Sequence, residues 1–358
     1  MKKNIYQYLL MALLLLGSAA TAMAGNPDRQ GEAGAYELLL NPWARSSGLH
    51  SMTTSCVRGA EAMFLNVAGI GRASTYGADS TTFTDIAMGH ARLYEGSGIS
   101  LSSFSIAQKL KSGGAIGLSI SAVDFGAINV TTTNQPEGTG ATYSPTFFNI
   151  ALGYSQTFVN KISVGFLFKG IVESTSDVSA TGFALDAGVQ YVTGAKDEFK
   201  FGISLKNIGS KMSFGGQGLS QSRQNPAGNY GYNLTYDTRG ASFELPSQLN
   251  IGASYDFLLN SSNRLTAVGN FTSNAFSRDI IGGGVEYGFG NYLALRAGYR
   301  YELGFDKGSA SLYTGVSAGV SVDIPIKKDT DNRVGIDYAY LPTNPFNGTH
   351  QLTVRIGL

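Results

Sequence analysis

The residue pattern with the clearest chemical signature is Gly315-Val316-Ser317-Ala318-Gly319, which spells the G-x-S-x-G of hydrolases. In that motif a sharp strand-to-helix turn exposes the serine to its catalytic partners. Here the five residues lie within a run of alternating apolar and small side chains, which is typical of a β-strand. We therefore interpret the glycines as room for strand curvature, and this motif predicts no catalytic serine.

The other side chains able to do chemistry are the histidines His50, His90 and His350 and the single cysteine Cys56. A metal site needs convergent ligands, and no histidine is closely spaced with acidic or cysteine partners. A serine and a histidine facing the lipid together could form a phospholipase, but the sequence selects neither His90 nor His350 for that role. One cysteine excludes a disulfide framework, and we expect a small buried side chain. The sequence thus predicts no enzyme, no metal and no cofactor.

The composition is typical of a membrane protein. Charged residues make up 14% of the chain, against about 25% in soluble proteins, and glycine, tyrosine and phenylalanine are abundant. A net charge of +1 gives no electrostatic reason to expect a nucleic-acid partner. No segment after residue 24 approaches the roughly 18 apolar residues of a membrane helix. A closed β-barrel is the other structure whose backbone groups are all satisfied in lipid.

The first 24 residues have the pattern of a secretory signal peptide. Lys2 and Lys3 form its positive region, residues 9–16 its apolar core, and Ala22-Met23-Ala24 its cleavage site. No cysteine stands directly after the cleavage site, where lipid would be attached, because the single cysteine is Cys56. We expect export through this signal peptide to the outer membrane of a Gram-negative bacterium.

Period-2 alternation recurs from residue 82 almost to the last residue. Leu293 and Leu295 would share one strand face, and Arg296 and Arg300 the other. The runs have the length of tilted membrane strands, about 10 residues. A soluble β-sandwich is the alternative, but its outward positions would be richly charged. We predict an all-β fold, a transmembrane antiparallel β-barrel of about 14 strands with an N-terminal plug segment. The predicted strands are 82–94, 97–109, 114–124, 146–159, 161–173, 181–193, 199–207, 247–258, 264–273, 279–288, 291–302, 310–322, 333–341 and 349–358.

The connections 125–145 and 208–246 are the longest between these strands. If the last strand ends in the periplasm, both face outside, as expected of bacterial barrels. Residues 208–246 combine glycines with aromatic residues, and tyrosine offers a large contact area at low entropic cost. We interpret this segment as a candidate extracellular cargo-binding loop; the alternative is an ordinary loop whose tyrosines pack on the rim. The candidate binding residues are Tyr230, Tyr232, Tyr236 and Phe243.

The residues before the first strand behave differently. The sequence AEAMFLNVAGIG at 60–71 predicts a short helical turn that ends at glycine. We predict three parts: a signal peptide (1–24), a plug or hatch segment inside or beneath the barrel (25–80), and the barrel itself (81–358). Two further short strands in 25–80 are the alternative.

Several segments resemble the PorV/PorQ family, a branch of the fatty-acid-channel-like barrels found in Bacteroidetes. The family's A-R-x-x-G run matches residues 44–48, and its N-P-A-G matches 66–69, where Val67 replaces the proline. Its F-G-x-x-x-K-N-I-G matches 201–209, and its L-R-A-G-Y matches 295–299. The matching positions of the plug motif are Arg45, Gly48, Asn66, Ala68 and Gly69.

The resemblance implies a component of the type IX secretion system, which transports proteins. Such barrels bind the C-terminal domain of exported cargo and pass it to, or belong to, the surface attachment complex. The implied partners are cargo C-terminal domains, translocon or sortase and attachment-complex proteins, and outer-membrane lipids. PorV-like and PorQ-like roles both stay open. The alternative function is a transporter of hydrophobic small molecules, as in fatty-acid channels of the same architecture.

Overall fold

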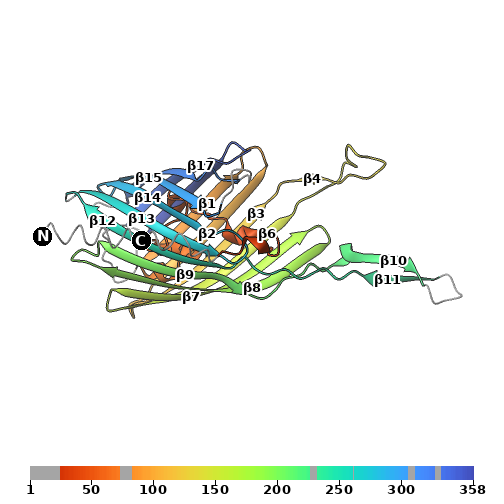
Figure 1. Cartoon of the computed structure of the whole chain (residues 1–358), viewed down its shortest axis with the longest axis horizontal. Helices are drawn as coiled ribbons and strands as arrows, with labels where there is room; N and C mark the ends of the chain where they lie inside the picture. The colour runs from red at the N-terminus through yellow and green to blue at the C-terminus, as the bar shows by residue number, and fades with distance from the viewer. Residues whose placement is uncertain (1–24, 73–82, 226–231, 261, 305–310, 327–331) are drawn as a thin grey trace.

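The computed structural model describes residues 25–72, 83–225, 232–260, 262–304, 311–326 and 332–358 (Figure 1). The signal peptide expected at 1–24 and the predicted plug residues 73–80 lie outside the described residues. The described strands form one closed antiparallel barrel of 14 strands, in which each pairs with its neighbour in sequence and β18 pairs with β1. The predicted fold is therefore confirmed. The barrel strands are β1 Thr84–Leu93, β2 Ile99–Lys109, β3 Gly114–Asp124, β6 Thr146–Phe158, β7 Ile162–Thr175, β8 Val178–Thr193, β9 Phe199–Gly209, β12 Gln248–Leu258, β13 Asn263–Asn274, β14 Ile280–Phe289, β15 Leu293–Glu302, β16 Val316–Pro325, β17 Arg333–Leu341 and β18 Thr349–Gly357.

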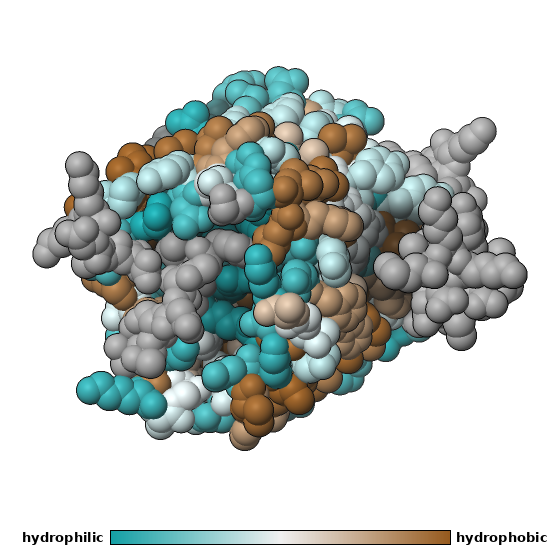
Figure 2. Space-filling view, turned by 90° about the vertical axis from the view of Figure 1, so that its left-hand side faces the viewer, coloured by the Kyte–Doolittle hydropathy of each residue, from teal (hydrophilic) through white to brown (hydrophobic). Residues whose placement is uncertain are grey.

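Each strand turns large apolar side chains outward and small or polar ones inward. On β7, Phe166 and Phe168 are 64% and 50% exposed on the outer wall, whereas Leu167 and Lys169 are buried in the lumen. An outer apolar surface around a polar interior is what a bilayer requires of a barrel. Seen from one end, hydrophilic residues occupy the centre of the molecule and hydrophobic ones its flank (Figure 2). No helix in the described part of the chain is long and apolar enough to cross a membrane.

The two ends of the barrel differ in their connections. We call the end that carries the last residue of β18 the C-terminal end, and the opposite one the hairpin end. At the hairpin end the connections of 125–145 and 210–247 carry two small sheets that project beyond the wall (Figure 1). These sheets are β4 Ile128–Asn129 with β5 Thr142–Tyr143, and β10 Ser220–Gln224 with β11 Asn233–Asp237, after the short helix η5 Gln217–Leu219. The two longest connections thus lie at the same end of the barrel, as expected from the predicted strand order.

One strand starts later than its alternation predicts. The sequence places a strand at 310–322, but β16 runs from Val316 to Pro325. Gly315 before it has φ of +92°, which ends the extended conformation there. Tyr313 beyond it turns toward the lumen, where its ring meets the ring of His50 edge-on at 5.6 Å between centroids. Before β16 the pairing is reduced to an isolated bridge between Tyr313 and Thr343 and to the hydrogen bond from the N–H of Arg300 to the carbonyl oxygen of Gly315.

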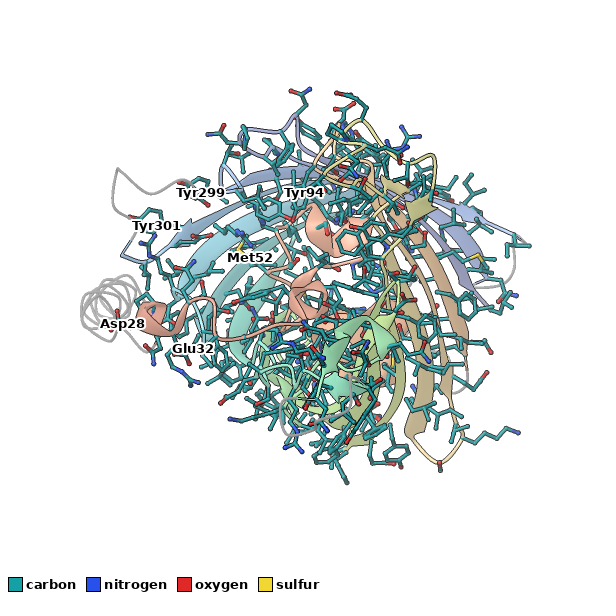
Figure 3. The ribbon with its side chains drawn as sticks, turned by 90° about the vertical axis from the view of Figure 1, so that its right-hand side faces the viewer. Asp28, Glu32, Met52, Tyr94, Tyr299 and Tyr301 are labelled. Atoms are coloured by element: carbon teal, nitrogen blue, oxygen red, sulfur yellow. The ribbon has the colours of Figure 1, made fainter. Side chains whose placement is uncertain are left out.

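Residues 25–72, which we call the N-terminal segment, begin beside the ring of strands, where Asp28 and Glu32 lie, and then run into its interior (Figure 3). The predicted helical turn is present as α3 and η4. Close backbone contacts place the segment against the wall: the Cα of Gly48 would lie 2.9 Å from any Cβ at Gly319 of β16. At Gly165 of β7, an added Cβ would meet the backbone N of Ala68 at 2.8 Å. Side chains at these glycines would push the two backbones apart. The helices of the segment are η1 Pro27–Arg29, η2 Tyr36–Leu39, α2 Ala44–Ser47, η3 Gly59–Glu61, α3 Ala62–Leu65 and η4 Val67–Gly71.

Candidate functional site

Asn66 joins the N-terminal segment to two strands of the wall. Its side chain is 1% exposed, and its Oδ1 accepts a hydrogen bond from the N–H of Ala68, which caps η4. Its Nδ2 donates to the carbonyl oxygens of Thr54 at 2.8 Å, Val189 at 3.2 Å and Ile203 at 3.3 Å. One amide thus holds together two turns of the segment, β8 and β9.

The other positions of the sequence motif also lie inside the barrel. Ala68 is fully buried, and a Cβ at Gly69 would meet the carbonyl oxygen of Val57 at 2.3 Å, so glycine is needed for this turn to pack. Gly48 makes the close approach to Gly319. Arg45 lines two cavities near the C-terminal end. The structure therefore brings Arg45, Gly48, Asn66, Ala68 and Gly69 into the interior.

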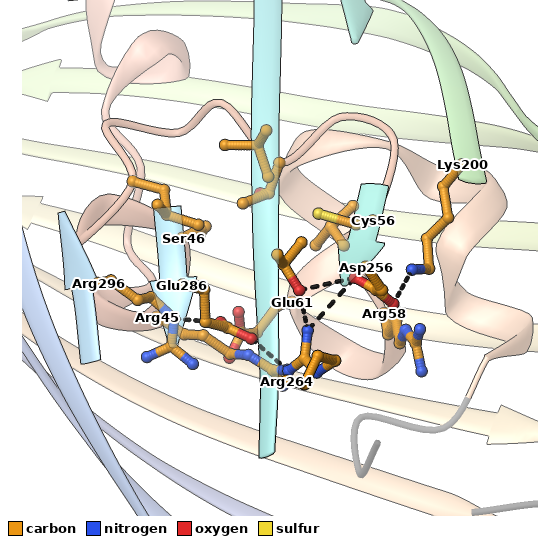
Figure 4. Close-up of a pocket in the computed structure, with 15 residues that line it drawn as sticks. Arg45, Ser46, Cys56, Arg58, Glu61, Lys200, Asp256, Arg264, Glu286 and Arg296 are labelled. Carbon is orange, nitrogen blue, oxygen red and sulfur yellow. Dashed lines mark hydrogen bonds and ion pairs between the residues drawn. The ribbon is translucent and has the colours of Figure 1, made fainter. Parts of the chain in front are cut away.

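Near the C-terminal end, neighbouring strands carry lumen-facing charges of alternating sign, which we call the charge belt (Figure 4). Lys200 on β9 pairs with Asp256 on β12, and Arg264 on β13 lies 3.5 Å from the same carboxylate. Around the ring, each side chain of the belt contacts the next. The members are Lys200, Asp256, Arg264, Glu286, Arg296, Ser321, Asp337 and Arg355.

Asp337 and Arg355 are the most deeply paired members of the belt. Asp337 is 0% exposed and accepts hydrogen bonds from Nε and Nη2 of Arg355 at 2.5 and 3.0 Å. Arg355 also reaches Asp323 at 3.0 Å and Glu61 of the N-terminal segment at 3.5 Å. The belt therefore fastens the segment electrostatically to the wall. In the sequence, almost every strand from β9 to β18 has one charged residue among its inward-facing positions. Alternation shows that these residues face inward, but it does not show that they contact one another.

Cavities lie between the N-terminal segment and the belt. Two adjoining cavities of about 40 Å³ and 100 Å³ share Arg45, Arg264, Glu286 and Arg296 among their lining residues. The smaller one is also lined by Cys56, whose side chain is partly exposed. Cys56 packs against the buried side chains of Leu49, Met52 and Val268, so the expected small buried side chain is found in part.

A third cavity, of about 80 Å³, lies nearer the hairpin end and is chemically different. Its cations are Lys206 of β9 and Arg300 of β15, and its apolar side chains include Leu39, Phe64 and Ile280. We call it the Lys206 cavity. Lys206 is 3% exposed, and its Nζ lies 3.9 Å from the centre of the Phe64 ring. Among the described residues no carboxylate forms an ion pair with Lys206.

His50 of the N-terminal segment also lines the Lys206 cavity. Its side chain is 4% exposed, and its buried Nε2 has no hydrogen-bond partner among the described residues. Burial, together with the nearby Arg300 cation, lowers the pKa of His50 to about 2. The imidazole is therefore neutral at physiological pH and free to hydrogen-bond a guest in the cavity.

The residues that suggested enzymes are placed as follows. Ser317 lies on β16 and donates to the carbonyl oxygen of Gly48 at 3.1 Å, so the strand interpretation of its motif is confirmed. His90 and Ser102 do face outward together on β1 and β2, with 3.1 Å between Nδ1 and Oγ. No acidic side chain orients His90 among the described residues, so the pair lacks the third member of a hydrolytic triad. His350 contacts Tyr338 and lies 3.3 Å from Glu95.

The candidate loop residues fall into two groups. Tyr232 and Tyr236 are 52% and 42% exposed near and on β11, whereas Tyr230 lies outside the described residues. Phe243 is partly buried at the base of the loop, where it stacks on Phe214 with 5.8 Å between ring centroids and packs near Gly34. Tyr232 and Tyr236 thus face solvent on the projecting sheet, and Phe243 anchors the loop to the N-terminal segment.

No protein-family model and no curated protein matches the sequence. Three solved channels share the fold. The monoaromatic hydrocarbon channel CymD has a TM-score of 0.54 at 13% identity, over 88% of this chain and 96% of that one. The toluene transporter TodX of Pseudomonas putida has a TM-score of 0.54 at 14% identity, over 89% and 98%. The toluene transporter TbuX of Ralstonia pickettii has a TM-score of 0.52 at 13% identity, also over 89% and 98%.

At these identities the likeness shows the fold alone. The chain has the 14-strand barrel of outer-membrane channels. This fold supports an outer-membrane location. The likeness extends over almost the whole length of the hydrocarbon channels.

Proposed function

We propose that the protein is an outer-membrane channel for hydrophobic small molecules that carry an anionic group. The Lys206 cavity is the observation that carries this proposal. Lys206 and Arg300 stand in it beside apolar side chains of the N-terminal segment and the wall. The carboxylate group of such a molecule would pair with Lys206 and Arg300, and the adjoining hydrocarbon part would contact Leu39 and Phe64. The fold shared with hydrocarbon channels supports transport over the other functions considered.

The electrostatics of Lys206 favour an anionic guest. An ammonium ion removed from water is costly unless it is paired, and the Phe64 ring offsets only part of that cost. Lys169 and Asp186 form their own ion pair at 2.8 Å nearby. The ammonium group of Lys206 is therefore buried without a carboxylate partner among the described residues, and a ligand carboxylate could pair with it.

The size of the cavity implies that the N-terminal segment moves during transport. Its volume of about 80 Å³ is roughly half that of a cavity that holds benzene, about 150 Å³. A head group fits, but a whole hydrocarbon chain does not. We infer that the N-terminal segment acts as a plug that shifts to let the molecule pass.

We expect Lys206→Met to remove the preference for anionic ligands. Purified wild-type protein should bind dodecanoate at least about 10-fold more tightly than dodecanol, since hydrogen bonds to charged groups contribute about 1.5–3 kcal/mol. In Lys206→Met the two affinities should converge, as measured by equilibrium dialysis with radiolabelled ligands. Lys211→Met is the matched control, because Lys211 is 63% exposed outside the cavity. Equal affinities in the wild type, or an unchanged ratio in Lys206→Met, would contradict the proposal.

Protein transport by the type IX system is the second candidate, and the projecting sheets favour it. Tyr236 on the second sheet, Tyr232 just before it and Tyr143 on the first sheet are all at least 36% exposed on elements that project beyond the barrel wall. Exposed apolar groups on projecting elements are typical of binding surfaces. The partners would be cargo C-terminal domains and translocon or sortase-complex proteins, as the PorV/PorQ resemblance implies.

We expect Tyr232→Ser together with Tyr236→Ser to lower cargo recovery at least about 10-fold if this second function operates, because buried tyrosines carry much of the energy of interfaces. The measurement is mass spectrometry of proteins copurified with the tagged barrel from its native membrane in mild detergent. Recovery of the barrel without secretion proteins, from wild type and variant alike, would exclude this role and leave small-molecule transport.

A further inference from the structure

The Lys206 cavity offers hydrogen-bonding groups that the carboxylate of a ligand would not use. They belong to β12 and β13, the two strands that follow β9 around the ring. The register places Gln248 of β12 opposite Lys206, so Asn250 is a diagonal neighbour of Lys206 on the lumen face. The polar side chains of these two strands that line the cavity are Gln248, Asn250, Asn270 and Thr272.

Only half of the Asn250 amide is used within the protein. Nδ2 of Asn270 donates to Oγ1 of Thr272 at 3.1 Å, and this hydroxyl in turn donates to Oδ1 of Asn250 at 2.7 Å. Thr272 thus fixes the amide of Asn250 through its oxygen. The Nδ2 group of Asn250, with two N–H donors, makes no hydrogen bond to any described residue and remains for a ligand in the cavity.

Two further side chains of the cavity also have an unused polar atom. Gln248 donates through Nε2 to Oδ1 of Asn274 at 2.7 Å, and its Oε1 accepts no hydrogen bond from a described residue. His50 is 4% exposed, and its Nε2 has no partner in the described part of the chain. Buried polar groups normally have partners and are costly without them. A ligand group that both accepts and donates would satisfy this side of the cavity.

We propose that the Lys206 cavity recognises a carboxylic acid that carries a hydroxyl group close to its carboxylate. The carboxylate pairs with Lys206 and Arg300, so this inference rests on the proposed function. The hydroxyl oxygen accepts from Nδ2 of Asn250, and its hydrogen is donated to Oε1 of Gln248. An unsubstituted fatty acid would leave both amides unsatisfied, so the site favours 2-hydroxy or 3-hydroxy acids over it.

The size of the cavity restricts where the hydroxyl can stand. A volume of about 80 Å³ holds the head group of such an acid but not its hydrocarbon chain. A hydroxyl at the far end of the chain would therefore lie outside the cavity, beyond Asn250 and Gln248. The position of the hydroxyl separates recognition by these amides from a general preference for polar ligands.

Equilibrium dialysis of the purified protein with radiolabelled ligands tests the proposal. At least one of 2-hydroxydodecanoate and 3-hydroxydodecanoate should bind the wild type about 10-fold more tightly than dodecanoate, the effect of one or two hydrogen bonds. We expect 12-hydroxydodecanoate to bind no more tightly than dodecanoate. The advantage of the 2- or 3-hydroxy acid should disappear in Asn250→Ala. It should persist in Asn129→Ala, because Asn129 is exposed on β4 outside the lumen.

The ligand series distinguishes failure of this inference from failure of the proposed function. If dodecanoate binds more tightly than dodecanol but neither the 2- nor the 3-hydroxy acid exceeds dodecanoate, the hydroxyl site is overturned and the anion channel stands. An equal gain for 12-hydroxydodecanoate, or an unchanged ratio in Asn250→Ala, would overturn the hydroxyl site as well. If none of these acids binds the wild type, both proposals fail. The wild-type comparison requires no variant to fold.

Discussion

Asp337→Asn is expected to destabilise the barrel by about 3–5 kcal/mol, the usual cost of leaving a buried charge without its partner. Asp337 is fully buried and is the principal partner of Arg355. Asparagine keeps the shape and one acceptor oxygen but removes the charge. Arg355 would then depend on Asp323, which is partly exposed, and on Glu61 at 3.5 Å.

Denaturant unfolding in detergent, followed by the circular dichroism of the strands, measures this loss. Asp237→Asn is the matched control, because Asp237 lies exposed on β11, where its carboxylate accepts a hydrogen bond from the hydroxyl of Ser220. An unfolding midpoint of Asp337→Asn equal to that of the control would mean that the charge belt does not contribute to barrel stability. Because the belt also reaches Glu61, we expect the N-terminal segment of the variant to become easier to displace as well.

Asn66→Asp is expected to detach the N-terminal segment from the wall before the barrel unfolds, at a cost of about 3 kcal/mol. The substitution retains the acceptor for Ala68 but removes the donor to the carbonyl oxygens of Thr54, Val189 and Ile203. It also places a buried carboxylate against these carbonyl oxygens, which repel it. Buried acceptors that lose their donor cost about 1–3 kcal/mol, and more where a charge is involved.

Trp43 makes the detachment visible, because it is the only tryptophan and is fully buried in the N-terminal segment. Its fluorescence should change at lower denaturant in Asn66→Asp than in the wild type, while the circular dichroism of the strands changes later. Asn129→Asp is the control, since Asn129 is exposed on β4. Coincident fluorescence and dichroism transitions in Asn66→Asp would mean that Asn66 does not hold the segment.

These two sets of contacts bear on the proposed channel. The charge belt and Asn66 hold the N-terminal segment in the lumen, where cavities of about 40, 80 and 100 Å³ lie beside it. Transport therefore requires the segment to exchange contacts with the wall. The Lys206 cavity lies next to Leu39, Phe64 and Leu65 of that segment, so a ligand entering there would compete with the packing that keeps the segment in place.

The sequence by itself determined the barrel and its strand order. Alternation is a local property, since successive side chains of a strand point to opposite faces and lipid demands large apolar residues on one of them. Each strand could therefore be recognised without knowledge of its partners. Alternation around residues 311–315 did not reveal that Gly315 adopts a φ of +92° or that the ring of Tyr313 meets His50, which lies more than 250 residues away in sequence. The resemblance singled out Asn66 and Gly48, but not what they touch.

Only the tertiary structure decided which inward-facing side chains meet. The N–H of Ala44 donates to Oγ1 of Thr353, 309 residues later, and Asn66 reaches β8 and β9 across more than 120 residues. The charge belt forms because the strand register brings polar and charged side chains of neighbouring strands to the same level of the barrel. A shift of a strand by one residue would turn its charge toward the lipid. Register and closure depend on all the strands together. The belt and the Lys206 cavity therefore form only when the ring is closed around the N-terminal segment.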